Sequence, residues 1–115
     1  MDALDRFDDY EAFANRPAGL LGTTTGFPTI DAALSGFRPQ QLVSVVALPK
    51  VGKSTLAMQM GIAAHDAGKT VMLQTIEMSA SEMLQRYDAM RAHVSYTRMS
   101  HGLLTPTEKV RYRQM

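Results

Sequence analysis

The chain has 115 residues, and its 12 lysines and arginines nearly balance 11 aspartates and glutamates, for a net charge of +1. This balance does not favour a protein that coats nucleic acid or binds a membrane surface by charge. Because the sequence contains no cysteine, disulfide bonds and thiolate zinc sites are excluded. The acidic N-terminal residues lack the apolar core of a signal peptide, and no apolar run approaches the roughly 18 residues of a membrane span, so we expect a cytoplasmic protein.

The first third of the chain predicts two helices joined by a loop. Apolar residues recur at helical spacing over residues 3–14. Proline and glycine within residues 15–19 break that pattern. A short helix is predicted over residues 30–34, with Thr29 as its cap and residues 35–36 as its end.

Two apolar runs rich in β-branched residues, 42–48 and 70–76, have the composition of parallel strands buried on both faces. Between them, residues 53–67 predict a helix, and Gly68 is placed to end it in the left-handed conformation. The apolar stripe of this helix is expected to be buried; it comprises Leu56, Met60, Ala63, Ala64 and Ala67.

Capping boxes predict two more helices, one opened by Ser79 with Glu82 and one by Thr105 with Glu108. The alternation of strands and helices predicts an α/β fold with parallel strands and crossover helices. Because two strands make a poor sheet, we expect the sheet to be incomplete.

The chemistry is concentrated in residues 47–54, Ala-Leu-Pro-Lys-Val-Gly-Lys-Ser, which match the P-loop (Walker A) pattern G-x-x-x-x-G-K-[ST] except for Ala47. Inward backbone N–H groups and a helix N-terminus make such a loop an anion site. Gly52 lets the backbone approach phosphate oxygens, Lys53 reaches the β- and γ-phosphates, and Ser54 places its hydroxyl on Mg²⁺.

We therefore predict ATP and Mg²⁺ as cofactors, with Ser54 as the metal ligand. The histidines show no metal-ligand spacing. The predicted nucleotide-binding residues are Pro49, Lys50, Val51, Gly52, Lys53, Ser54 and Thr55.

From residue 22 onward the sequence resembles the motor domain of DnaB-type replicative DNA helicases, a RecA-like P-loop NTPase domain. In that family the glutamate after the second strand polarises the water that attacks the γ-phosphate, so the resemblance assigns this role to Glu77 and makes Glu77 and Lys53 the predicted catalytic residues. The stretches that carry the resemblance are Thr25-Gly-Phe-Pro-Thr-Ile-Asp31, Gly36-Phe37, Ala47 with Pro49, and Ile76-Glu-Met-Ser79 followed by Arg86.

The resemblance implies a division of the chain. Residues 1–21 correspond in position to a linker helix and loop that dock on an adjacent subunit, and residues 22–115 to the front part of the ATPase domain. The family's second acidic motif, DNA-facing loops, arginine finger and primase-contacting domain find no match here. We therefore expect a nucleotide-binding helicase portion that is inactive alone. It would act with like subunits or a complementing half in a ring, and reach DNA only in that assembly.

Two other interpretations stay open. RecA- or RadA-like repair ATPases share the P-loop, although they differ in the residues after the glutamate at position 77. A non-enzymatic protein that docks on an intact helicase and blocks its ring is the other interpretation.

Two residues depart from the family's pattern outside the phosphate loop. Gln40 follows a proline where the family has glycine, and a type II turn there needs a positive φ. A glutamine in that conformation costs about 1 kcal/mol or forces a different turn. Ser35 replaces a glycine where a helix ends.

Overall fold

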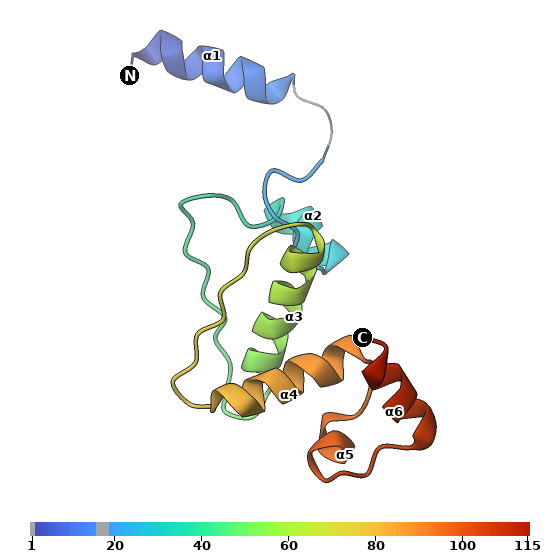
Figure 1. Cartoon of the computed structure of the whole chain (residues 1–115). Coiled ribbons are helices and arrows are strands. Elements are labelled where there is room, and N and C mark those ends of the chain that lie inside the picture. Colours follow the sequence, from blue (N-terminus) through green and yellow to red (C-terminus); the bar gives the residue numbers. More distant parts are fainter. Residues whose placement is uncertain (1, 16–18) are drawn as a thin grey trace.

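The computed structural model describes residues 2–15 and 19–115. Figure 1 shows α1 set apart at the N-terminal end, α3 through the middle of the molecule, and α4 to α6 gathered at the other end. None of the helices within the described residues is long and apolar enough to cross a membrane. The helices are α1 (Ala3–Ala14), α2 (Pro28–Leu34), α3 (Lys53–Asp66), α4 (Ala80–Arg91), α5 (Tyr96–Ser100) and α6 (Pro106–Arg113).

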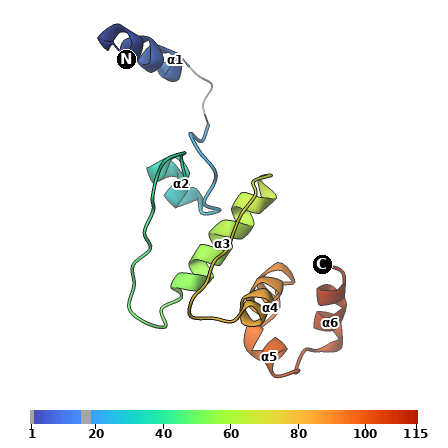
Figure 2. The same cartoon turned by 60° about the vertical axis from the view of Figure 1, so that its left-hand side comes forward.

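The predicted parallel sheet is wrong. The described residues hold no strand, and their one pairing of this kind is an isolated antiparallel bridge between Thr23 and Phe37. Residues 42–48 and 70–76 run in stretched paths beside α3 (Figures 1 and 2). Neither segment makes a backbone–backbone hydrogen bond to another described residue. Apolar, β-branched composition suits a strand, but a strand also needs a neighbour whose backbone groups complete the hydrogen bonds, which composition does not report.

The two stretched segments alternate their side chains between α3 and solvent. Their odd-numbered residues Val43, Val45, Val71 and Leu73 line an open apolar groove of about 290 Å³ together with residues of α3. Their even-numbered apolar residues are at least 78 % exposed. Those residues are Leu42, Val46, Leu48, Met72 and Ile76.

Helix α3 buries a different face from the predicted one. Its buried residues are Met58 and Ile62, whereas the stripe predicted from residue 56 to residue 67 is only half-buried or exposed. The reason is that α4 packs against α3 and supplies buried Ala89, with Ala92 just beyond its end. The face expected to meet a sheet lines the open groove instead.

Local capping sets the starts of α4 and α6 where the sequence predicts them, although only the second capping box is reciprocal. The Ser79 hydroxyl accepts a hydrogen bond from the Glu82 N–H at 3.2 Å, and Thr105 with Glu108 forms a reciprocal capping box. The short helix α5 was not predicted. Its cap is Ser95, whose hydroxyl accepts a hydrogen bond from the backbone three residues later.

The ends of α2 are less regular. It begins at Pro28 with Phe27 as its N-cap residue, so the predicted cap at Thr29 is wrong. Ser35 and Gln40 both adopt positive φ, 60° and 64°. Each non-glycine residue therefore takes the left-handed conformation that the family's glycine would adopt readily.

A tight loop anchors the start of the family-like region. Asp31 accepts hydrogen bonds from the Thr24 hydroxyl at 2.5 Å and from the Thr25 N–H at 2.8 Å. The hydrogen bond from Thr24, followed by that from Thr25, lowers the pKa of Asp31. Gly22 lies where the two sides of the loop meet. A Cβ at this position would come within 2.1 Å of the Phe37 carbonyl oxygen, which shows how closely the two backbone segments approach.

The first helix is confirmed at its predicted bounds and carries an uncovered apolar face. No residue of α1 is buried. Leu4, Phe7, Tyr10 and Phe13 are 47–70 % exposed. Asp2 caps the helix in a reciprocal capping box with Asp5, so local sequence is sufficient to define it.

Candidate functional site

The residues predicted to form the P-loop lie between the stretched segment 42–48 and the first turn of α3. Gly52 is the N-cap residue of α3, with φ of 103° and no side chain to cap the helix. Lys50 also adopts a positive φ, 63°, a conformation that costs a non-glycine residue about 1 kcal/mol or more and often marks a functional site. The first N–H groups of α3 therefore have no side-chain cap, which leaves them available to an anion.

A cavity of about 340 Å³ opens at this loop, and it brings the predicted catalytic residues together. Lys53 enters from the start of α3, while Glu77 enters from the segment that follows residues 70–76. Val51, which is 66 % exposed, is the one predicted binding residue outside the lining. The lining residues are Pro49, Lys50, Gly52, Lys53, Ser54, Thr55, Glu77 and Arg86.

The charges that line this cavity favour a polyanion. Lys50, Lys53 and Arg86 are cationic, and Glu77 is the one carboxylate among the lining residues. The net charge of the whole chain is only +1, so positive charge is concentrated at the loop. Such clustering in a concave site raises the local concentration of anions.

The donors in the cavity suit a magnesium ion that arrives with a nucleotide. Within the described residues, no group of three or more histidine, aspartate or glutamate side chains could hold a metal ion. Among the lining residues, Ser54 and Thr55 carry hydroxyl oxygens and Glu77 carries a carboxylate. Mg²⁺ is commonly held by one or two protein oxygens together with substrate phosphates and water, so these residues fit it.

Sequence reasoning used Arg86 only as part of a family motif and missed it as a site residue. Arg86 lies in α4 and reaches the cavity beside Glu77. The signal that could have found it is its spacing from Glu82, four residues earlier, which favours an ion pair on one helix face. That ion pair is present, with a distance of 2.8 Å between Arg86 Nη2 and Glu82 Oε1.

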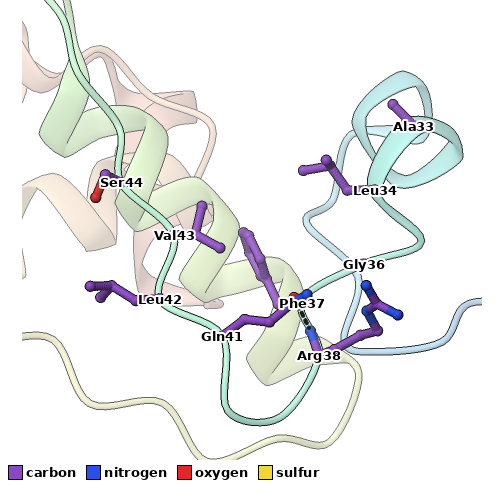
Figure 3. A pocket seen from close by; sticks show the side chains of 9 residues that line it. All are labelled: Ala33, Leu34, Gly36, Phe37, Arg38, Gln41, Leu42, Val43 and Ser44. Carbon is purple, nitrogen blue, oxygen red and sulfur yellow. Dashed lines mark hydrogen bonds between the residues drawn. The ribbon is translucent and has the colours of Figure 1, made fainter.

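A larger cavity of about 560 Å³ lies between α2 and residues 36–44 (Figure 3) and lacks this chemistry. Arg38 is the one charged residue among its described lining residues. The Arg38 backbone N–H donates a hydrogen bond to the Gln41 side-chain oxygen at 3.0 Å, drawn as a dashed line in Figure 3. With no cluster of titratable groups, this cavity is not the candidate site.

Comparison with known proteins identifies the family of the chain. Residues 22–115 match the model of the DnaB-like helicase C terminal domain. The chain is 33 % identical over 108 residues to the replicative DNA helicase DnaB of Geobacillus stearothermophilus, an alignment that covers 91 % of this chain and 23 % of that protein.

Other relatives give the same result. The chain is 36 % identical over 100 residues to the replicative DNA helicase DnaB of Haemophilus influenzae, covering 86 % of this chain and 21 % of that protein. The chain is 31 % identical over 105 residues to the replicative DNA helicase DnaC of Bacillus subtilis, an alignment that covers 89 % of this chain and 23 % of that protein. It thus spans about a fifth of the length of these relatives. The predicted resemblance is confirmed, and the chain belongs to the family of the DnaB-like helicase C-terminal domain.

Proposed function

We propose that this chain is the nucleotide-binding portion of a replicative DNA helicase and that its P-loop cavity binds ATP with Mg²⁺. The observation that carries the proposal is the cavity of about 340 Å³ that gathers Lys53, Ser54 and Glu77 with the loop backbone. The sequence motif alone predicts only the loop that would hold the phosphates. The carboxylate of Glu77 comes from a separate segment of the chain, and phosphoryl transfer needs such a group to orient the attacking water.

Each residue has a defined task in this proposal. The loop N–H groups and the start of α3 hold the inner phosphates, and the Lys53 ammonium neutralises charge on the β- and γ-phosphates. The Ser54 hydroxyl would hold Mg²⁺, which would supply positive charge to the terminal phosphate oxygens. The Glu77 carboxylate accepts a hydrogen bond from the attacking water and polarises it.

Unwinding would require more than this cavity. Among the residues that line the cavity, Glu77 is the one carboxylate. An arginine finger alone is worth roughly 10³–10⁵ in rate. We therefore propose that hydrolysis and DNA contact arise in an assembly with like subunits or a complementing helicase half, in a ring, and that the chain alone turns over ATP negligibly.

Isothermal titration with Mg²⁺–ATP tests the binding step. Lys53→Ala removes the charge that faces the β- and γ-phosphates, so affinity should fall roughly tenfold or more. Arg113→Ala removes one positive charge from α6, away from the cavity, and serves as the matched control. Equal affinity of the wild type and Lys53→Ala would overturn the proposal.

A second function is favoured by the exposed apolar residues of the stretched segments, of which Leu42 and Ile76 are 94 % and 97 % exposed. Surfaces of this kind often bind another protein. Under this alternative the chain docks on an intact DnaB-type helicase and inhibits it without using its own nucleotide site. Inhibition by the Lys53→Ala variant at wild-type strength would support it. The family match favours either helicase-related function over a RecA- or RadA-like repair ATPase.

A further inference from the structure

Lys50 carries a positive charge in the loop between residues 42–48 and α3. Its side chain is exposed, and it lines the phosphate cavity together with Lys53, which follows it by three residues. The two lysines therefore bring two positive charges to one cavity from a single stretch of the chain. Only Lys53 belongs to the P-loop pattern, because that pattern accepts any residue at the position of Lys50.

The charge of Lys50 is not neutralised by a carboxylate of the protein. None of the ion pairs among the described residues involves Lys50. Glu77, the one carboxylate in the lining of the cavity, takes part in none of them either. Unpaired cations that line a concave site attract anions from solution. Lys50 is therefore available to an anion that enters the cavity.

The backbone of Lys50 has a conformation that few side chains adopt. Its φ is 63°, in the left-handed region that glycine, and after it asparagine and aspartate, adopt at the lowest cost. Non-glycine residues in this region are found where the surrounding structure imposes the strain, and they are frequent at ligand-binding loops. At Lys50 this strained backbone and an unpaired positive charge coincide in one cavity-lining residue.

We infer that the Lys50 ammonium is a second cationic ligand of the phosphate chain and strengthens the binding of nucleoside diphosphates and triphosphates alike. This inference rests on the proposed nucleotide binding. It adds a binding side chain that the P-loop pattern leaves open. The loop to which Lys50 belongs would hold the inner phosphates, which ADP and ATP share. A lysine acts on phosphate as a point charge on a flexible stem, so salt should screen its contribution.

Isothermal titration of the full chain with Mg²⁺–ATP and with Mg²⁺–ADP tests the assignment. Lys50→Asn removes the charge but introduces a residue that tolerates the left-handed conformation. Both affinities should therefore fall by about threefold to fivefold, the upper range for an exposed ion pair. Lys50→Arg keeps the charge and should bind both nucleotides as the wild type does. In about 1 M salt, where the screening length is about 3 Å, the difference between the wild type and Lys50→Asn should disappear.

Lys69→Asn makes the same chemical change at an exposed lysine outside the cavity and should leave both affinities unchanged. Unchanged affinities of Lys50→Asn would overturn the inference. An equal loss in Lys50→Arg and Lys50→Asn would assign Lys50 a conformational role and overturn it as well. A loss confined to ATP would also overturn it, because ADP has the same inner phosphates. A wild type that binds neither nucleotide would instead contradict the proposed function.

Discussion

Arg91, the last residue of α4, donates hydrogen bonds from Nη1 to both carboxylate oxygens of Asp66, the last residue of α3, at 2.8 Å each. At the other end of the same contact, Met83 of α4 and Ser54 of α3 line one small cavity. Helix α4 therefore packs against α3, and the ion pair joins the last residues of the two helices. Because α3 carries Lys53 and α4 carries Arg86, this packing brings both residues to the cavity beside residues 49–55.

The Arg91–Asp66 pair should contribute modestly to stability. Its side chains are 34 % and 51 % exposed, so solvent screens the attraction. Arg91→Ala should lower the free energy of unfolding by about 0.2–1 kcal/mol in urea denaturation followed by circular dichroism. Asp66→Ala should have a similar effect, and the double variant should lose less than the sum. Strictly additive losses would show that the pair contributes nothing.

Gly22 should tolerate no side chain. A Cβ there would lie 2.1 Å from the Phe37 carbonyl oxygen, which is backbone and cannot rotate away. Gly22→Ala should therefore destabilise the chain by about 1–3 kcal/mol in thermal unfolding, the range of overpacked sites. Gly19→Ala is the matched control, because a Cβ at Gly19 meets nothing within 4 Å. Equal melting temperatures for the two variants would contradict the close approach of the two backbone segments.

Asp31 should make stability depend on acidity. Its hydrogen bonds from Thr24 and Thr25 lower its pKa in the folded chain. The folded state therefore binds fewer protons than the unfolded state around the ordinary aspartate value of about 3.9. The stabilisation is present above about pH 4 and is lost as the pH falls through the lowered pKa. As the pH is lowered across this range, the melting temperature of Asp31→Asn should fall less steeply than that of the wild type. Identical slopes of melting temperature against pH would exclude the effect.

Glu77 should separate binding from turnover. In an assembly that hydrolyses ATP, Glu77→Gln keeps the size of the side chain but loses the carboxylate charge, which we propose polarises the attacking water. Phosphate release should fall by about 10² or more, while ATP affinity stays within about threefold of the wild type. Glu11→Gln on α1 makes the same chemical change at a residue outside the cavity and serves as the control. Robust hydrolysis by the unassembled chain would show that the cavity already contains every catalytic group.

The exposed even-numbered residues of the stretched segments should cause self-association. Val46 and Ile76 are 89 % and 97 % exposed, and exposed apolar surface of this kind associates in water. Sedimentation velocity should detect oligomers that grow with concentration, and Val46→Ser with Ile76→Ser should reduce them. The control variant Leu103→Ser, at a residue outside these segments that is 66 % exposed, should not reduce the oligomers. A monomer at every concentration for the wild type would contradict this expectation.

Prediction from sequence succeeded where one local interaction decides the outcome. The capping hydroxyls of Ser79 and Thr105 each bond a backbone group three residues away, so a short window of sequence contains the whole interaction. Glycine at position 68 takes φ of 83° at the end of α3 for the same local reason. Thr29 failed as a cap because its neighbour Pro28 already starts the helix.

The amino-acid sequence by itself determined α1, the capped starts of α4 and α6 and the P-loop motif, since each depends on residues close together in the chain. It also showed the family, through several such short stretches. Only the tertiary structure decided that residues 42–48 and 70–76 form no strand, because strand pairing depends on distant backbone partners. It also decided that Met58 and Ile62 are the buried face of α3, since burial depends on which helix packs there. Tertiary structure also decided that Glu77, Arg86 and Lys53 line one cavity, because separate segments form a cavity only after they pack together.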